Sequence, residues 1–234
     1  RAARGKPVVN CISIGEGERI AAMVTARTFT DDESLIFATR NGTVKKTTLS
    51  AYGNVRSVGI NAINIDADDE LIEVQKTHGN DDIVLGTRHG MSIRFHESDV
   101  REMGRATTGV KGITLSKGDY VIGMVVVRER AELLAVSEKG IGKRSAIADY
   151  RVQKRGGKGI ITMQRTAKTG ELVALKDVLP EEELMMITKG GIIIRCPVLR
   201  IRVSGRNTQG VKLMNLDPED RIIDVARIQK EDGD

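Results

Sequence analysis

Aromatic residues and cysteines are scarce in this sequence, and long apolar runs are absent. Aromatics make up 3% of the 234 residues and tryptophan is missing, so the core has to be built from Ile, Val, Leu and Met. Cys11 and Cys196 are too few for a disulfide framework, which favours a reducing compartment. No uncharged apolar run approaches the ~20 residues of a membrane span, and the N-terminus lacks the apolar region of a signal peptide. We therefore expect a cytoplasmic protein with no membrane partner.

Helical periodicity is also absent, and a repeat of about fifty residues takes its place. Four segments share an apolar run, a polar pair, a glycine and a second β-prone run: "LIFATRNGTVKKTTLSAY", "IVLGTRHGMSIRFHESDV", "LLAVSEKGIGKRSAIADY" and "LMMITKGGIIIRCPVLRI". Their glycines, at intervals of 48, 50 and 51 residues, are Gly42, Gly90, Gly140 and Gly191. Because glycine adopts the positive φ of a tight turn between two strands, each segment predicts a β-hairpin.

The second half of each repeat has its own pattern, in which short strands flank an acidic turn. The acidic residues are Glu70, Asp119, Glu171 and Asp220, and Glu18 fits the same register near the N-terminus. A period near 50 with about four strands per unit predicts an all-β, propeller-like disc of four-stranded antiparallel blades. We place one domain over residues 1–230, with an acidic tail at 231–234. Its divisions are a partial blade at 1–28 and whole blades at 29–78, 79–128, 129–178 and 179–230.

The net charge of +5 and the pI of about 9.2 favour a polyanionic partner. Basic residues recur three or four positions after each turn glycine, where blade symmetry would carry them to one rim of the disc. We therefore predict an exposed basic stripe on that rim. Its members are Lys45, Lys46, Arg94, Lys143, Arg144 and Arg195.

A second concentration of charge lies in "YRVQKRGGKGI", residues 150–160. Six basic residues stand against one acidic residue between Lys143 and Lys158, and this surplus equals the net charge of the whole chain. Glycines in such a segment let the main chain approach phosphates and direct N–H groups at them. Duplex DNA fits best, because single-strand binders need aromatic stacking platforms. The predicted contacts here are Arg151, Gln153, Lys154, Arg155, Gly156, Gly157, Lys158 and Gly159.

The segment "QKRGGKG" resembles the QRRGGKG box in the C-terminal domain of DNA gyrase A, and departs from it only at Lys154. The repeats and the stretches "NGTVKKT", "TTGVKGI" and "GRNTQGV" also resemble that family, over essentially the whole chain. The resemblance implies a β-pinwheel whose blades exchange a strand with their neighbours. It also implies that duplex DNA bends around the basic rim, with residues 153–159 as the main determinant of wrapping.

The resemblance further implies that this chain is the non-catalytic part of an ATP-hydrolysing type II topoisomerase. The expected partners are duplex DNA, the rest of gyrase A, and gyrase B in an A2B2 holoenzyme of the bacterial nucleoid. Mg²⁺ and ATP would belong to that holoenzyme, and we expect no cofactor, metal or catalytic residue in this chain. Tyr52, Tyr120 and Tyr150 occupy repeat positions, and the three histidines lack partners at metal-ligand spacing.

Two alternatives and one question about the box stay open. The corresponding domain of topoisomerase IV is the nearest rival, although its discs generally lack an intact box. A protein-binding propeller is the other, and the shortage of aromatic anchors disfavours it. In the family the box lies in the first blade, whereas here it lies in the third whole repeat. Either a second box lies upstream, or this lineage carries its box late in the disc.

Overall fold

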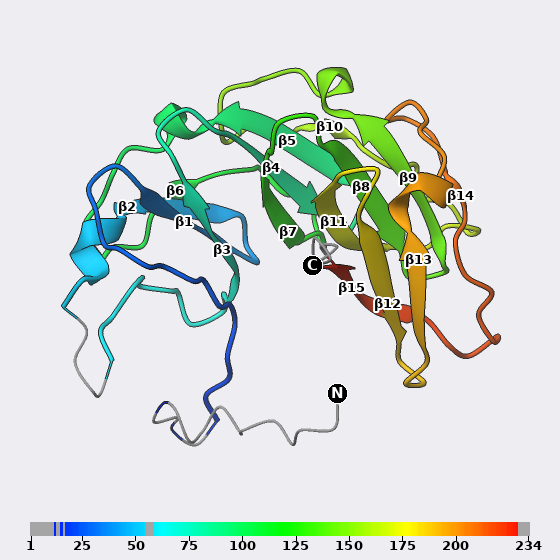
Figure 1. The fold of residues 1–234 in the computed structure, drawn as a ribbon, viewed down its shortest axis with the longest axis horizontal. Helices are drawn as coiled ribbons and strands as arrows, with labels where there is room; N and C mark the ends of the chain where they lie inside the picture. The colour runs from blue at the N-terminus through cyan, green and yellow to red at the C-terminus, as the bar shows by residue number, and fades with distance from the viewer. Residues whose placement is uncertain (1–11, 13–14, 16, 55–58, 229–234) are drawn as a thin grey trace, which may run out of the picture.

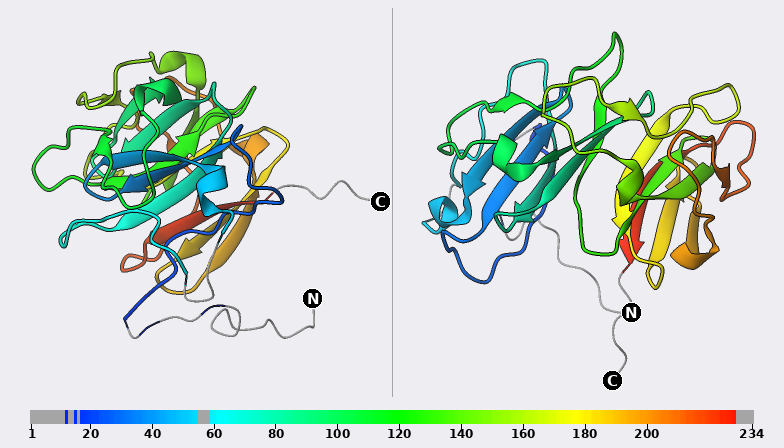
Figure 2. Two further views of the ribbon diagram at one scale, coloured as in Figure 1. Left: turned by 90° about the vertical axis from the view of Figure 1, so that its left-hand side faces the viewer. Right: turned by 90° about the horizontal axis from the view of Figure 1, so that it is seen from above.

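The computed structural model describes residues 12, 15, 17–54 and 59–228, and it confirms an all-β fold. Four antiparallel sheets follow one another along an arc in the order of the sequence (Figures 1 and 2). Within the described ranges the helical content is limited to short 3-10 turns, and no helix is long and apolar enough to cross a membrane.

Each repeat begins with the predicted hairpin. The turn glycines all have positive φ, between 75° and 86°. The tight turn needs a residue in the left-handed backbone conformation, which glycine adopts without strain. The hairpin strands are β1 (Ser34–Thr39) with β2 (Thr43–Thr48), β4 (Asp82–Thr87) with β5 (Met91–His96), β8 (Glu132–Ser137) with β9 (Ile141–Ala146), and β12 (Glu183–Thr188) with β13 (Ile193–Pro197).

A third strand pairs with the first strand of each hairpin, and these third strands pack against one another along the inner side of the arc. They are β3 (Leu71–Thr77), β7 (Val121–Val126), β11 (Leu172–Val178) and β15 (Ile222–Ile228). The acidic turn before each strand fixes the hairpin turn. Asp119, for example, accepts hydrogen bonds from His89 N at 2.9 Å and from Thr87 Oγ1 at 2.7 Å.

The fourth strand of a sheet comes from the following repeat. Short strands β6 (Val110–Lys111), β10 (Ile160–Ile161) and β14 (Val211–Lys212) pair with the outer hairpin strands β2, β5 and β9 of the preceding repeat. We call the stretches that carry them the delivered segments, which are residues 101–113, 151–163 and 202–214. The strand exchange implied by the resemblance is thus present. The fourth sheet differs from the prediction, because among the described residues it has three strands.

The core is aliphatic and crosses the boundaries between repeats. One cluster joins Ile36 and Val44 of the first repeat to Ile83 and Phe95 of the second. It also includes Ile113, which the first delivered segment lays over the first hairpin. Each of the first three sheets is therefore completed, in hydrogen bonds and in packing, by residues about sixty to seventy positions away in the chain.

The predicted N-terminal partial blade is described only in part. Residues 17–28 form no strand, although Val24 and Ala26 pack against the apolar cluster of the first repeat. Cys11 and the tail at 231–234 lie outside the described residues. Cys196 is half-buried against the core of the fourth repeat, where it packs as a small hydrophobe.

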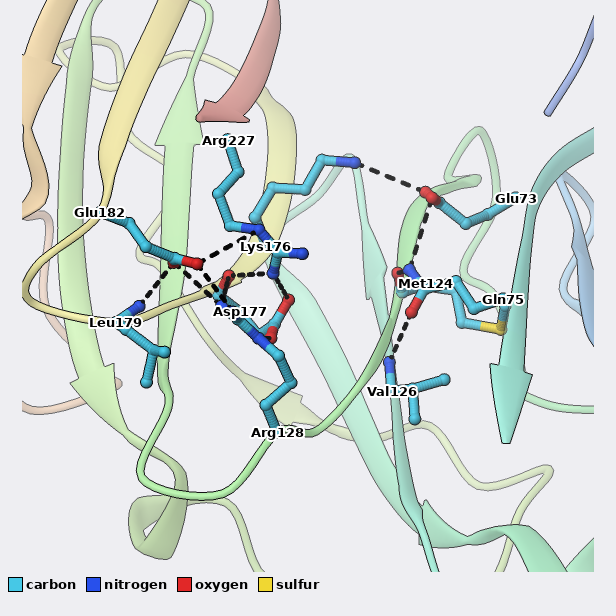
Figure 3. Close-up of polar contacts among 10 residues, drawn as sticks. All are labelled: Glu73, Gln75, Met124, Val126, Arg128, Lys176, Asp177, Leu179, Glu182 and Arg227. Carbon is cyan, nitrogen blue, oxygen red and sulfur yellow. Dashed lines mark hydrogen bonds and ion pairs between the residues drawn. The ribbon is translucent and has the colours of Figure 1, made fainter. Parts of the chain in front are cut away.

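An ionic cluster joins the second, third and fourth repeats (Figure 3). Arg128 follows β7 and pairs with Asp177 of β11 and with Glu182 at the start of the fourth repeat. Arg227 of β15 completes the cluster with an ion pair to Asp177 at 2.7 Å. Burial alone would raise the pKa of Glu182, but the hydrogen bonds from Arg128 and Leu179 and the nearby positive charges lower it.

We expect Glu182→Gln to lower the free energy of unfolding by about 1.5–3 kcal/mol at pH 7, because the half-buried Arg128 loses one of its two anionic partners. The folded-state pKa of Glu182 lies below the unfolded value, so this contribution is complete above about pH 5 and lost as pH falls further. Urea unfolding of both proteins between pH 3 and 7 measures the difference.

The exposed neighbour Glu181 provides the matched control. Glu181→Gln should change stability by less than about 0.5 kcal/mol at any pH in this range. A difference between wild type and Glu182→Gln that is independent of pH would contradict the role of the carboxylate charge.

Candidate nucleic-acid interface

The box, residues 153–159, lies on the second sheet rather than on the hairpin of its own repeat. Gln153 N donates to Arg94 O at 2.8 Å, and Gly156 N donates to Gly112 O at 2.6 Å. Thr114 N donates to Gly157 O at 2.8 Å. The main chain of the box is therefore fixed by the second hairpin and by the delivered segment next to it.

Two of the box glycines are required by the way the main chain of the box packs against its neighbours. Gly159 has φ +75°, and a Cβ at this position would overlap the carbonyl oxygen of Ser92 on β5. Gly156 also has positive φ, and its N–H is already bonded within the protein. The expectation that the Gly156 N–H points at a phosphate is therefore wrong. Gly157 has an ordinary φ and only Ile93 Cδ1 close by, at 3.5 Å from an ideal Cβ.

The charged side chains of this segment divide into two groups. Arg151, Lys154 and Lys158 are exposed, as predicted. Arg155 turns inward, where its Nε donates to Asp99 O at 2.8 Å and its Nη1 to Lys111 O at 3.0 Å. Gln153 is half-buried with its Nε2 enclosed and without a protein partner, so it does not present a donor to solvent.

The predicted exposed stripe of basic residues after the hairpin glycines is wrong. Lys45 and Lys143 are 0% and 1% exposed, and Lys46 and Arg144 are also buried. Their strands looked like rim strands in the sequence, but the delivered segments of the next repeats cover them. A position that would face solvent in an isolated hairpin is here buried between two repeats.

The two buried lysines bind main-chain carbonyl groups of the delivered segments, and Lys45 also binds one of its own repeat. Lys45 Nζ donates to Ala62 O and Arg105 O, both at 2.5 Å. Lys143 Nζ donates to Gly205 O at 2.8 Å and to Arg206 O. Burial lowers the pKa of each lysine to about 8. Arg105 adds to the pKa shift at Lys45, whereas at Lys143 the carboxylate of Asp149 opposes it and Arg206 adds to it.

The basic residues one position further on are also structural. Arg94 pairs with Asp82 and donates to Ile147 O at 2.9 Å and Tyr150 O at 3.0 Å, which fixes the turn that leads into the box. Arg144 pairs with Glu132 and donates to Ile201 O in the same way, and Lys46 pairs with Glu97. Arg195 is the exception, because its side chain is 57% exposed and pairs with Glu183.

A different set of cations recurs on the surface, and the sequence interpretation missed most of it. Arg101, Arg151 and Arg202 open the three delivered segments at intervals of 50 and 51 residues, and all three are exposed. Lys111 and Lys212 are exposed on the delivered strands. Together the three segments contain ten basic residues and one acidic residue. The spacing was visible in the sequence, but the outward direction depends on the strand exchange.

Catalytic features are not apparent in the described ranges. No group of three or more His, Cys, Asp and Glu side chains is placed to hold a metal ion there. Tyr150 is buried and its hydroxyl contacts Thr162 Oγ1 at 2.7 Å. The Tyr120 ring lies beneath the guanidinium groups of Arg40 and Arg88.

Propeller-like blades that exchange a strand, with a cationic outer perimeter and a Gly-Gly box, define the β-pinwheel class. Comparison with known families then identifies the particular family. The sequence model of the DNA gyrase C-terminal domain, beta-propeller, matches residues 33–78, 81–128, 131–178 and 182–229. The chain belongs to this family.

Individual relatives agree with this assignment. The DNA gyrase A protein of Deinococcus deserti is 46% identical over 99% of this chain, and that of Staphylococcus aureus MRSA252 is 44% identical over 100%. The chain spans 29% and 27% of the lengths of these relatives. Among solved structures, a DNA topoisomerase IV C-terminal domain superposes with a TM-score of 0.89 at 25% identity, covering 96% of this chain and 71% of that one. A DNA gyrase A C-terminal domain gives a TM-score of 0.86 at 24% identity, covering 97% and 76%.

We expect Lys143→Met to lower the free energy of unfolding by about 1–3 kcal/mol, because two carbonyl groups of the delivered loop lose their donor. Faster amide exchange should be concentrated in the loop at 204–208, which Lys143 holds. Urea unfolding and hydrogen exchange measure the two effects. Lys168→Met, at an exposed lysine, is the control with the same change of charge. An equal effect of both variants would contradict the proposed role of Lys143 in holding this loop.

Proposed function

We propose that the chain binds duplex DNA along its outer perimeter and bends it around the arc. The observation that carries this proposal is the recurrence of exposed cations along the three delivered segments. These segments lie side by side on the outer edges of successive sheets, so their charges follow the curve of the arc. Phosphates are evenly spaced along a duplex and are bound well by cations that recur at regular positions.

The chemistry of the perimeter favours binding through the DNA backbone. The cations stand on loops and two-residue strands, and within the described ranges no helix or long ribbon is available to enter a groove and read base edges. Sequence preference would then come from the ease of bending the duplex. The box residues Lys154 and Lys158, together with Arg151, form the densest part of this surface, where the bend would be anchored.

The relatives named as the A protein of DNA gyrase support a place for this chain in a larger enzyme. We propose that it is the non-catalytic wrapping domain of a bacterial gyrase, acting with gyrase B in an A2B2 holoenzyme of the nucleoid. ATP-dependent negative supercoiling, with its Mg²⁺ and ATP, would be performed by the other domains. The nearly intact box favours gyrase over topoisomerase IV, since the fold resembles both.

Replacing Arg151, Lys154 and Lys158 together by Ala should weaken duplex binding with little change in stability, because all three side chains are exposed. If wild type contacts six to ten phosphates, its affinity should fall ~10³- to 10⁵-fold between 50 and 200 mM salt. The log–log salt slope of the variant should be smaller by about 2 to 3. Fluorescence anisotropy with a labelled duplex across this salt range measures both quantities.

The matched control replaces Lys117, Lys168 and Lys189 by Ala, which removes three exposed charges away from the delivered segments. Binding should weaken much less in this control. Equal losses in the two triple variants would show that the net charge of the chain, and not its perimeter, determines binding.

Bending with a defined hand predicts a change in DNA topology. When a nicked plasmid is ligated with the chain bound, we expect a shift of the linking number towards positive writhe. The shift should disappear in the Arg151/Lys154/Lys158 alanine variant at protein concentrations that restore binding. Tight binding by wild type with an unchanged linking number would contradict wrapping while leaving DNA binding intact.

A further inference from the structure

The second residue of each delivered segment occupies an equivalent place on the outer edge of its sheet. These residues are Glu102, Val152 and Val203. Each forms an isolated parallel bridge to the outer strand of the hairpin beneath it. The residue that follows donates its N–H to the same strand, as Gln153 N does to Arg94 O at 2.8 Å and Ser204 N does to Arg144 O at 2.9 Å. The main chain is therefore fixed against the hairpin at all three positions.

The main-chain polar groups of the bridged residue itself face away from the hairpin. In a parallel bridge of this kind, the carbonyl before the bridged residue and the N–H after it are the groups that pair with the neighbouring strand. Arg144 N accordingly donates to Arg202 O at 3.2 Å, on the other side of Val203. Val152 and Val203 thus each direct a main-chain N–H outward from the edge of a sheet.

The side chains of these two valines are exposed in cationic surroundings. Val152 is 54% exposed and Val203 is 45% exposed. The residues before them, Arg151 and Arg202, are exposed as well. One exposed valine is ordinary on a protein surface. Two of them at equivalent, fixed positions of successive segments place apolar surface repeatedly among the cations of the perimeter.

The backbone of DNA has the same pair of chemical properties. Each nucleotide carries an anionic phosphate, which accepts hydrogen bonds from main-chain N–H groups, next to a sugar that proteins also contact. The carbon atoms of deoxyribose are apolar and suit a β-branched side chain. Valine has no polar side-chain atom with which to read the donor and acceptor pattern of a base edge. A valine position with an outward N–H therefore matches one phosphate and the sugar beside it.

The first delivered segment departs from this arrangement. Glu102 is exposed at the equivalent position, and it is the one acidic residue in the sequences of the three delivered segments. Its carboxylate accepts hydrogen bonds from Ser34 Oγ at 3.3 Å and from Thr48 Oγ1 at 3.5 Å. Because like charges repel at an interface, this carboxylate opposes the close approach of a phosphate to the main chain there.

We propose that Val152 and Val203 bind the sugar–phosphate backbone, with the main-chain N–H donating to a phosphate and the side chain packing against the neighbouring deoxyribose. Glu102 weakens the equivalent contact, so the duplex lies closer to the second and third delivered segments than to the first. The inference rests on the proposed binding of duplex DNA and adds a neutral contribution to it. Cations determine how the affinity varies with salt, whereas the valine contacts strengthen binding equally at every salt concentration.

A double variant separates the two contributions. Val152→Ala combined with Val203→Ala should lower the affinity for a labelled duplex about three- to tenfold, because apolar contact is lost. The log–log salt slope should stay that of wild type, because no charge is removed. Fluorescence anisotropy across a range of salt concentrations measures both quantities. Ile223→Ala, at a side chain that is 51% exposed on the inner strand β15, is the matched control and should leave the affinity unchanged.

The converse change is made at Glu102. Glu102→Gln should strengthen binding because it removes a negative charge from the perimeter. Glu102→Val should strengthen it about twofold or more beyond Glu102→Gln, at the same salt slope, because it adds the apolar contact. Equal affinities of these two variants would overturn the proposal.

Methyl NMR of the intact, valine-labelled chain bound to a short duplex identifies the part of the DNA that is contacted. We expect nuclear Overhauser effects from Val152 and Val203 to deoxyribose protons. Effects to base protons or thymine methyl groups in their place would overturn the proposal. So would salt-dependent binding by wild type that the double valine variant leaves unchanged, although the proposed function would then stand. Absence of duplex binding by wild type would overturn both.

Discussion

The structure depends on one repeated interaction, in which a turn glycine accepts two N–H groups from a segment of the next repeat. Gly42, Gly90 and Gly140 each make this contact. It closes the outer edge of a sheet, buries an aliphatic residue over the turn, and brings the loop before the delivered strand to the perimeter. The same contact therefore determines how the sheets hold together and where the cations face. Where the described part of the chain does not supply it, at Gly191, apolar surface and an arginine are left exposed.

The local parts of the fold were predictable because their determinants are local. A glycine between two β-prone runs determines a hairpin, and the acidic residue before each inner strand is visible in the repeat. The strand exchange was not derivable from the pattern of residues, since a delivered strand is only two residues long and carries no periodicity of its own. It entered as an implication of the family resemblance. The three-stranded fourth sheet follows from that exchange, yet the sequence interpretation did not draw this consequence.

In the candidate site, too, some features were predictable from the sequence and others depended on the strand exchange. Lys154 and Lys158, which the local concentration of charge singled out, are exposed. Lys45 and Lys143 were assigned to the surface because blade symmetry carries their positions to one rim of the disc. The neighbouring repeat supplies carbonyl groups that make their burial tolerable, Arg105 O for Lys45 and Gly205 O for Lys143. Arg101 and Arg202 had the same period as the residues that were chosen. Periodicity shows that positions are equivalent, but the direction of a side chain depends on what covers its strand.

A repeat of the sequence is consequently not a unit of the folded molecule. Since each of the first three sheets borrows its outer strand from the following repeat, a single backbone cut between their hairpins would leave both fragments joined by a β-ladder and a shared apolar cluster. For the same reason, a whole repeat removed by recombination leaves one hairpin facing a segment that was matched to another. The number of blades in such a disc can therefore change over evolution only if acceptor and donor change together.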